Sequence, residues 1–266
     1  MTSIHPSAII DPAAEIDSSA IIGPYVIIEG QARIGARTRI MAHSHIVGRA
    51  IIGDDNEIYT GAAIGHPPQH LGYKGEETGV VIGNRNVFRE YVTIHRAYEE
   101  GHNTTIGDHN FLMSCSHVGH DAVMGSRIVM ANCALLGGHT TVGDGAVLSG
   151  NVAVHQFVRI GRLAMIGGVT RVIQDVPPFM MVVGHSEIHG LNVVGMRRAG
   201  FSPQTRRHIK HAYKLLYRSG FNVQNSLKAI EAEIGDACPE VTSMVEFIRA
   251  STRGICHPGK SGDGGE

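Results

Sequence analysis

The sequence predicts a mainly β protein, a parallel β-helix of six-residue (hexapeptide) repeats followed by a small C-terminal α-helical domain. Three observations support this. An aliphatic, Met or Phe side chain recurs at every sixth position between Ile4 and Val172, with two interruptions. Gly often follows that side chain, and after Ser202 the apolar residues change to helical spacing. A period of six fits neither a helix nor strand alternation, but it fits a short strand plus a corner, three times per turn of a triangular prism.

The repeated aliphatic side chains are expected to point into the prism. The Gly after them relieves crowding at the corner and can take a positive φ. Repeat residues followed by Gly include Ile22, Ile34, Ile82, Ile106, Val142 and Ile160. Ala is common two positions earlier, where the side chain faces the same way, as at Ala8, Ala14, Ala20, Ala62, Ala122, Ala134, Ala146 and Ala164. An all-β sandwich would not hold a six-residue phase over so many repeats.

The repeat is interrupted at residues 66–81 and at about residues 96–105. Insertions in a solenoid become loops that project from one face, which is often the binding face. We therefore expect the β-helix to occupy residues 1–190, with two projecting loops that belong to a functional site.

A helical domain is expected over residues 191–253. Ser202 is a good N-cap with Pro203 at the first helical position, and Gly220 closes this helix. Residues 227–234 suggest a second helix and residues 239–249 a third. The polar, Gly-rich tail over residues 254–266 is expected to be disordered.

Composition argues against nucleic-acid binding and membrane insertion, because the net charge is −1 and no stretch is long and apolar enough to span a bilayer. The four cysteines have no zinc-type spacing and are interpreted as free thiols of a reducing, cytoplasmic compartment. Cys115 and Cys133 are eighteen residues apart, so they are expected to lie one coil above the other.

One segment is strongly basic. Residues 188–230 contain eight Lys or Arg and no Asp or Glu. These are Arg197, Arg198, Arg206, Arg207, Lys210, Lys214, Arg218 and Lys228. A basic face without compensating acids favours an acidic partner or a phosphate-bearing ligand over a merely solvated helix.

Histidine is abundant, with seventeen in the chain, and several fall in the middle coils outside the inward register. The cluster comprises His95, His117, His120, His139 and His155. A neutral imidazole can take a proton from a sugar hydroxyl, and a neighbouring carboxylate such as Asp121 could set its tautomer. Backbone N–H groups around Gly137 and Gly138 could stabilise an oxyanion. Because no GxSxG motif is present, direct attack by an acceptor hydroxyl is favoured over a covalent intermediate.

The same histidines allow a second interpretation. His95, His117 and His120 could bind a metal between subunits, as in hexapeptide-repeat hydratases of the γ-carbonic anhydrase kind. That family lacks a basic C-terminal helical segment, so the preferred prediction is an enzyme with no metal and no cofactor.

The chain resembles the bacterial UDP-N-acetylglucosamine O-acyltransferases that begin lipid A synthesis, over residues 4–253. The segments that carry this resemblance are residues 52–59, 92–96, 117–121, 153–157, 174–178 and 212–220. The resemblance implies a left-handed coil and a homotrimer with active sites between adjacent β-helices. It also implies a 3-hydroxyacyl donor on acyl carrier protein and the glucosamine 3-hydroxyl of UDP-N-acetylglucosamine (UDP-GlcNAc) as acceptor.

Residue roles follow from the same resemblance. His120 matches the general base with Asp121 beside it, Gly138 matches the oxyanion donor, and Gly168 matches the position that sets acyl-chain length. Gly at position 168 predicts a long chain. The positions expected to contact substrates are His70, Tyr73, His95, His117, His139, His155, Gln156, Asn192 and Arg198. The acidic acyl carrier protein is the expected partner of the basic segment.

Four positions depart from the family pattern. His70 and Gly72 stand where the family often has an acidic residue and a Lys, while Val194 replaces a Glu and Ala199 an Arg. These departures leave open an alternative reaction, N-acylation of a 3-amino analogue of the sugar nucleotide.

Overall fold

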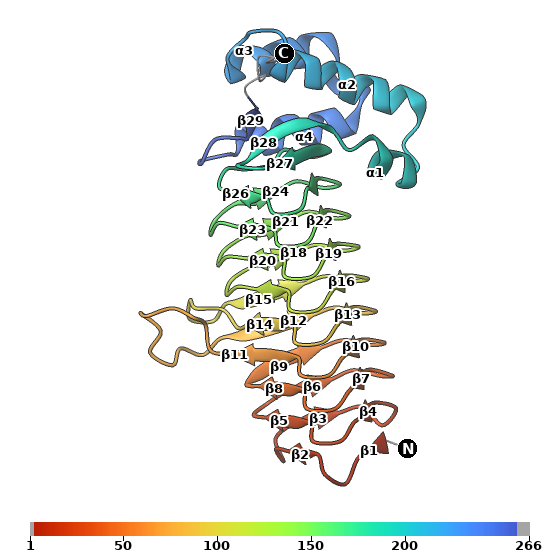
Figure 1. Ribbon diagram of the computed structural model, residues 1–266, viewed down its shortest axis with the longest axis vertical. Helices are drawn as coiled ribbons and strands as arrows, with labels where there is room; N and C mark the ends of the chain where they lie inside the picture. The colour runs from red at the N-terminus through yellow and green to blue at the C-terminus, as the bar shows by residue number, and fades with distance from the viewer. Residues whose placement is uncertain (1–2, 260–266) are drawn as a thin grey trace, which may run out of the picture.

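The computed structural model describes residues 3–259 and shows a tall triangular prism with helices at one end (Figure 1). Each coil contributes one short strand to each of three sheets, and neighbouring coils pair in parallel until the last strands. We call the passage from first to second sheet the 1–2 corner, from second to third the 2–3 corner, and from third to first the 3–1 corner.

The first sheet contains β1 (Ser3–Ile4), β4 (Ile21–Ile22), β7 (Arg39–Ile40), β10 (Glu57–Ile58), β13 (Val87–Phe88), β16 (Phe111–Leu112), β19 (Val129–Met130), β22 (Val147–Leu148), β25 (Met165–Ile166), β27 (Met180–Val183), β28 (Glu187–Leu191) and β29 (His257–Pro258). The second contains β2 (Ile9–Ile10), β5 (Ile27–Glu29), β8 (His45–Val47), β11 (Ala63–His66), β14 (Thr93–His95), β17 (His117–Val118), β20 (Leu135–Leu136), β23 (Ala153–Val154) and β26 (Arg171–Val172). The third contains β3 (Glu15–Ile16), β6 (Arg33–Ile34), β9 (Arg49–Ile52), β12 (Gly79–Ile82), β15 (Asn103–Ile106), β18 (Val123–Met124), β21 (Thr141–Val142) and β24 (Arg159–Ile160).

The core is a column of stacked aliphatic side chains, as the repeat predicts. Ile22 pairs with Ile40 across neighbouring coils, and both are buried. The predicted inward alanines from Ala20 onward are fully buried as well. Among the described residues no coil lies beyond β1, and Ile4 in that strand is 43% exposed. The C-terminal end is closed by β27, where Met180 and Val182 are buried.

The corners correct one expectation about the glycines. Gly65 takes a positive φ, but the other Gly residues that directly follow a repeat residue do not; at those corners the positive φ falls two residues after the Gly, on side-chain-bearing residues such as Asp55 and Asp121. Gly is required there by close approach, because a Cβ on Gly53 would lie 2.7 Å from the carbonyl oxygen of Gly83 in the next coil. Relief of crowding is therefore the general reason for Gly at these corners, and positive φ the exception found at Gly65.

The two interruptions form loops that project from the same side of the prism, between β11 and β12 and between β14 and β15 (Figure 1). They are tied to each other. Arg96 donates to the Tyr73 hydroxyl at 3.0 Å, and the Glu77 amide donates to the Glu100 carboxylate at 2.9 Å. The loops therefore act as one structural unit beside the middle coils.

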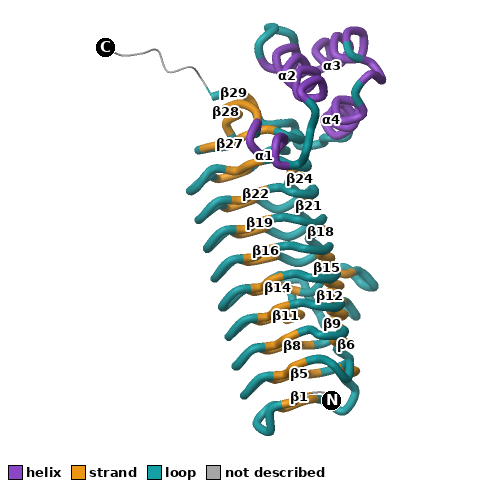
Figure 2. Tube along the Cα trace, turned by 90° about the vertical axis from the view of Figure 1, so that its right-hand side faces the viewer, coloured by secondary structure: helices purple, strands orange, loops and turns teal. Residues whose placement is uncertain are grey.

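The C-terminal helices are α1 (Val193–Arg198), α2 (Pro203–Tyr217), α3 (Val223–Glu233), the short 3₁₀ helix η1 (Gly235–Ala237) and α4 (Pro239–Arg249). Ser202 caps α2 by accepting from the Thr205 amide, as predicted. The sequence did not predict α1. Helices α2, α3 and α4 pack together above the prism (Figure 2). No helix among residues 3–259 is long and apolar enough to cross a membrane.

The prediction of a disordered tail is wrong for residues 254–259. The chain returns to the β-helix, where β29 pairs in parallel with β28 and Cys256 donates its amide to Asp175 at 2.8 Å. Ile255 and Cys256 are buried, and that apolar burial offsets the entropy of ordering the segment. Residues 260–266 lie outside the described part of the chain.

Candidate active site

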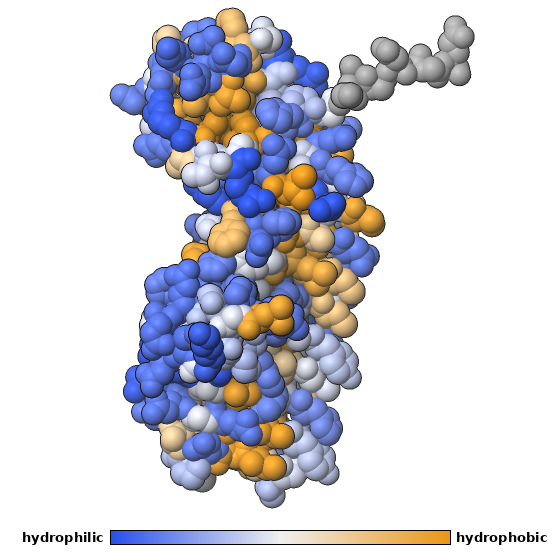
Figure 3. All heavy atoms as spheres, turned by 90° about the vertical axis from the view of Figure 1, so that its left-hand side faces the viewer, coloured by the Kyte–Doolittle hydropathy of each residue, from blue (hydrophilic) through white to orange (hydrophobic). Residues whose placement is uncertain are grey.

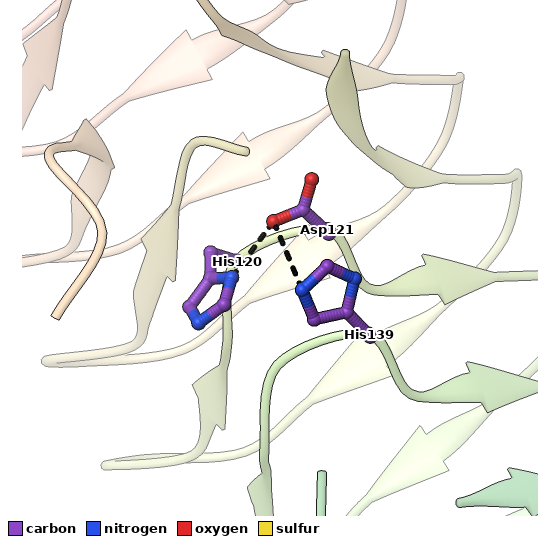
Figure 4. A group of neighbouring side chains, drawn as sticks. All are labelled: His120, Asp121 and His139. Carbon is purple, nitrogen blue, oxygen red and sulfur yellow. Dashed lines mark hydrogen bonds and ion pairs between the residues drawn. The ribbon is translucent and has the colours of Figure 1, made fainter. Parts of the chain in front are cut away.

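The residues that could perform chemistry gather at the 2–3 corner of the middle coils. His120 and Asp121 follow β17, and His139 follows β20 one coil further on. Asp121 and His139 both have a positive φ, of 58° each, and both side chains turn toward His120 from this corner (Figure 4). The corner conformation therefore brings three ionisable side chains from two coils into one cluster.

His120 and Asp121 form a tight pair. The His120 Nδ1–H donates to the Asp121 Oδ2 at 2.7 Å, and the two side chains are 11% and 6% exposed. Asp121 Oδ2 also accepts from the Tyr98 amide at 2.8 Å. This bonding assigns the proton to Nδ1 and leaves the lone pair of a neutral imidazole on Nε2.

The second imidazole of the cluster is His139. Its Nε2 lies 3.8 Å from Asp121 Oδ2, and its ring stands edge-on to His120 with centroids 5.1 Å apart. On its other side it stacks on Phe157 with centroids 4.6 Å apart. Asp121 Oδ1 is buried and has no hydrogen-bond partner among the described residues. The site thus retains one unused carboxylate oxygen.

Gly138 lies against the free edge of His120. A Cβ at position 138 would stand 2.6 Å from both Nε2 and Cε1 of His120, so any larger residue would displace the imidazole. Among residues 3–259 no protein acceptor is assigned to the Gly138 amide. The residue that faces the Nε2 edge of His120 is therefore one whose backbone N–H group is unengaged.

His95 in β14 and His117 in β17 extend the cluster toward the N-terminal end of the prism. Their rings are edge-on with centroids 5.1 Å apart, and the Thr93 hydroxyl bonds His117 Nδ1 at 2.8 Å. Burial, with smaller contributions from neighbouring histidines, lowers the pKa of His95 to about 4. Burial and then His120 lower the pKa of His117. Both imidazoles are therefore neutral at neutral pH.

The projecting loops contribute the predicted His70 and Tyr73. His70 stands edge-on to His120 with centroids 5.5 Å apart. Tyr73 instead holds the loop, since its hydroxyl donates to the Glu76 carbonyl at 3.0 Å and accepts from Arg96. Sequence reasoning missed Tyr98, which contacts both His70 and Asp121. Its only sequence signal was its place in the second interruption.

His155 and Gln156 lie at the same corner, one coil above His139. Both are exposed, and His155 Nδ1 lies 3.0 Å from the Gln156 carbonyl oxygen and 3.3 Å from Arg253. These side chains extend the 2–3 corner site toward the C-terminal end. The surface is hollowed between the hydrophilic middle coils and that end of the molecule (Figure 3).

Three predicted residues lie elsewhere. Asn192 and Arg198 line a cavity of about 490 Å³ beside β22 and β25 of the first sheet, and Gly168 lies at the 1–2 corner. The Asn192 side chain is already engaged, because it caps α1 through the Gly195 amide and donates to the Leu163 carbonyl. A single prism does not bring these positions to His120.

The only group of potential metal ligands found within residues 3–259 is His120, Asp121 and His139, whose ligand atoms lie within 4.8 Å of one another. The set expected from sequence, His95 with His117 and His120, is not the one that converges. The donor set of two imidazoles and a carboxylate is compatible with zinc.

Comparison with known proteins gives a consistent result. Residues 175–256 match the family model described as Udp N-acetylglucosamine O-acyltransferase, Domain 2. The acyl-[acyl-carrier-protein]--UDP-N-acetylglucosamine O-acyltransferase of Burkholderia lata is 45% identical over 260 residues, which cover 96% of this chain and 99% of that protein. The protein of the same name from Paracidovorax citrulli is 48% identical over the same shares.

The solved structure of the Francisella novicida UDP-N-acetylglucosamine acyltransferase has a TM-score of 0.93 to this chain at 38% identity, covering 97% of this chain and 95% of that one. This likeness confirms the predicted fold, a left-handed parallel β-helix with a C-terminal helical region.

Proposed function

The chain belongs to the acyl-[acyl-carrier-protein]–UDP-N-acetylglucosamine O-acyltransferases, and from this premise we propose how its residues perform the reaction. The enzyme transfers an acyl chain from acyl carrier protein to UDP-GlcNAc, the first step of lipid A biosynthesis. We infer that the chain is a 3-hydroxyacyl group, that the acceptor is the glucosamine 3-hydroxyl, and that no cofactor takes part. The pair formed by His120 and Asp121 carries the mechanistic proposal.

His120 acts as the general base. Its Nε2 takes the proton of the 3-hydroxyl while the hydroxyl oxygen attacks the thioester carbonyl carbon. Asp121 holds the Nδ1 proton at 2.7 Å and stabilises the imidazolium that forms. The neutral His95 and His117 place no positive charge beside that imidazolium.

Gly138 supplies the oxyanion contact. The new carbon–oxygen bond moves the carbonyl electrons onto oxygen, and Gly138, the residue that faces His120 Nε2, has an unengaged backbone N–H to receive that charge. Collapse breaks the carbon–sulfur bond, and the thiolate of the carrier's prosthetic arm takes the proton back from His120. The products are the ester and the free thiol.

We infer that the working unit is a homotrimer. His120, Gly138 and Gln156 lie at the 2–3 corner, whereas Asn192 and Arg198 line a cavity against the first sheet. A neighbouring copy that presents its first-sheet cavity to this corner would complete the sugar-nucleotide site. Arg198 would then meet the diphosphate, and Gln156 with Asn192 the nucleoside.

Helix α2 offers a docking surface for acyl carrier protein. Arg207, Lys210, Lys214 and Arg218 follow one face of the helix, and all four are exposed. None of the four has an ion-pair partner among the described residues. An acidic carrier protein fits this face. The four free thiols support a reducing, cytoplasmic location.

We propose that the acyl chain lies along the 1–2 corner. A Cβ at Gly168 would meet only the Gly150 carbonyl oxygen, at 3.5 Å, so the space above Gly168 is open. Open space at this position accommodates a long chain. Gly168→Met should shift the preference toward chains shorter by several carbons, because the new side chain fills that space.

The test is an acyl-transfer assay on the purified protein with 3-hydroxyacyl carrier proteins of several lengths. UDP-GlcNAc and its 3-amino analogue serve as acceptors in parallel. Transfer of long chains to UDP-GlcNAc supports the proposal. Transfer only to the amine favours the N-acyltransferase alternative, for which the departure at His70 is the motivation. Zinc-dependent hydratase activity without acyl transfer would instead favour the metal-site alternative, which rests on the donors of His120, Asp121 and His139.

A further inference from the structure

The two projecting loops bring three residues into contact beside the catalytic pair. The rings of His70 and Tyr98 lie 4.1 Å apart between centroids at 40°. Both also approach His120, with centroid distances of 5.5 Å from His70 and 6.0 Å from Tyr98. His70 is exposed and Tyr98 half-buried, so the pair presents ring surface to solvent next to the base.

Gly72 makes this arrangement possible. A Cβ at position 72 would stand 2.9 Å from the Tyr98 hydroxyl oxygen and 3.2 Å from Nδ1 and Cε1 of His70. The Gly72 amide donates to His70 Nδ1 at 3.1 Å, which leaves the Nε2–H of a neutral His70 free. His70, Gly72 and Tyr98 therefore depend on one another sterically, although 26 residues separate Gly72 from Tyr98 in the chain.

The backbone links this group to the chemistry. The Tyr98 amide donates to Asp121 Oδ2, the same oxygen that accepts from His120 Nδ1. Any displacement of the Tyr98 backbone thus moves an N–H group that donates a hydrogen bond to the Asp121 carboxylate. The second loop is held in turn by the first through Arg96 and Tyr73.

We propose that His70, Gly72 and Tyr98 form one aromatic wall that receives the acceptor hexosamine over His120, and that Tyr98 is an acceptor-binding residue of the reaction. The proposal rests on the acyltransferase function given above. Sugar rings pack their C–H faces on aromatic rings, and the free His70 Nε2–H is a donor for a sugar hydroxyl. The departures at positions 70 and 72 are then parts of one unit with Tyr98.

The test introduces a methyl group at position 72 that clashes with the Tyr98 hydroxyl, and then removes that hydroxyl in a second variant. Gly72→Ala should raise KM for UDP-GlcNAc about fivefold, the loss expected when one aromatic contact is displaced. Tyr98→Phe alone should raise this KM less than Gly72→Ala does, because it keeps the ring and loses only the hydroxyl group. The double variant Gly72→Ala/Tyr98→Phe should recover most of the loss, because it removes the hydroxyl oxygen that the new methyl meets. His70→Ala, at an exposed position that folding does not need, should also raise this KM.

Leu71→Ala is the matched control, since Leu71 lies between the two altered positions and is fully exposed. It should leave both KM values and the thermal midpoint unchanged, and KM for the acyl donor should stay constant in every variant. The proposal of an aromatic wall is overturned if the double variant keeps the raised KM for UDP-GlcNAc. It is also overturned if Gly72→Ala has the same KM for UDP-GlcNAc as Leu71→Ala. Absence of transfer by wild type and Leu71→Ala alike overturns the proposed function itself, and the wall with it.

Discussion

Two corners of the same coil use polar residues in opposite ways. At the 3–1 corner Asn56, Asn86 and Asn110 form a buried ladder through successive coils. The Asn56 Oδ1 accepts from both the amide and the side chain of Asn86, the Asn86 Oδ1 accepts from the Asn110 amide, and the Asn110 Oδ1 accepts from the Ile128 amide. At the 2–3 corner Asp121 keeps an unused oxygen, and Gly138 an unengaged amide.

The difference separates stability from function within one repeat. Saturated polar groups inside the prism stabilise neighbouring coils, because each buried donor has its acceptor. Unsaturated groups at the outer corner leave binding capacity for a substrate and its transition state. Substitutions at the two corners should therefore change different properties.

The largest effect short of removing the base is expected at Gly138. Gly138→Ala would place a methyl against His120 Nε2 and Cε1 and force the imidazole away from its position. We expect kcat to fall about 100-fold or more, as when an oxyanion contact is lost. The thermal midpoint should remain close to wild type, because the displaced imidazole lies outside the aliphatic column that forms the core of the prism. Near-normal kcat in Gly138→Ala would contradict the proposal that Gly138 supplies the oxyanion contact.

Asp121→Asn should give a smaller loss. The amide oxygen can still accept from His120 Nδ1 and the Tyr98 amide, since both bonds converge on one oxygen. Only the negative charge disappears, so the imidazolium loses its charge-assisted partner and kcat should fall roughly 10- to 100-fold. Steady-state rates at saturating substrate measure this. An unchanged rate would mean that Asp121 merely positions the ring.

Asn86→Ala should destabilise the protein at the 3–1 corner. It removes the bond to Asn56 Oδ1 and leaves the buried Asn110 amide without its acceptor. The expected loss of stability is about 2–4 kcal/mol. Thermal or denaturant unfolding measures it, while kcat at 25 °C should be that of wild type. A lowered kcat in a fully folded Asn86→Ala enzyme would contradict the separation of roles.

The smallest expected effect is the pH dependence of stability at His95. Its pKa is about 4 in the folded protein and about 6.5 in the unfolded chain, so the unfolded state binds more protons between these values. Stability is therefore fully present above pH 6.5 and declines as the pH falls toward 4. Between pH 7 and pH 5 the share of His95 is about 1–2 kcal/mol. His95→Asn should lose less stability over that interval, and equal losses would exclude His95 as the cause.

The sequence predicted the prism well because its period is local and repeated. Each inward Ile or Ala carries the same information, so single irregularities did not matter. The third predicted helix matches α4 at Pro239–Arg249, since Pro at its start and its apolar spacing are also local signals. The return of residues 254–259 to the β-helix was missed, because pairing of β29 with β28 is a contact between segments about 70 residues apart.

The site was predictable only in part. His120, Asp121 and Gly138 could be placed together because register stacks neighbouring coils. Tyr98 could not be assigned a place, since a loop inserted between strands has no fixed register. The positions of Asn192 and Arg198 beside the first sheet follow from the cavity that they line there and from the bond of the Asn192 side chain to the Leu163 carbonyl, not from any periodic pattern.

The most direct test of the central claim is the turnover of His120→Ala measured beside its thermal midpoint, with 3-hydroxyacyl carrier protein and UDP-GlcNAc as substrates. Loss of the general base should reduce kcat by at least about 100-fold while the midpoint stays at the wild-type value. A folded His120→Ala enzyme with near-normal turnover would show that the base lies elsewhere, and it would contradict the assignment of catalysis to the 2–3 corner.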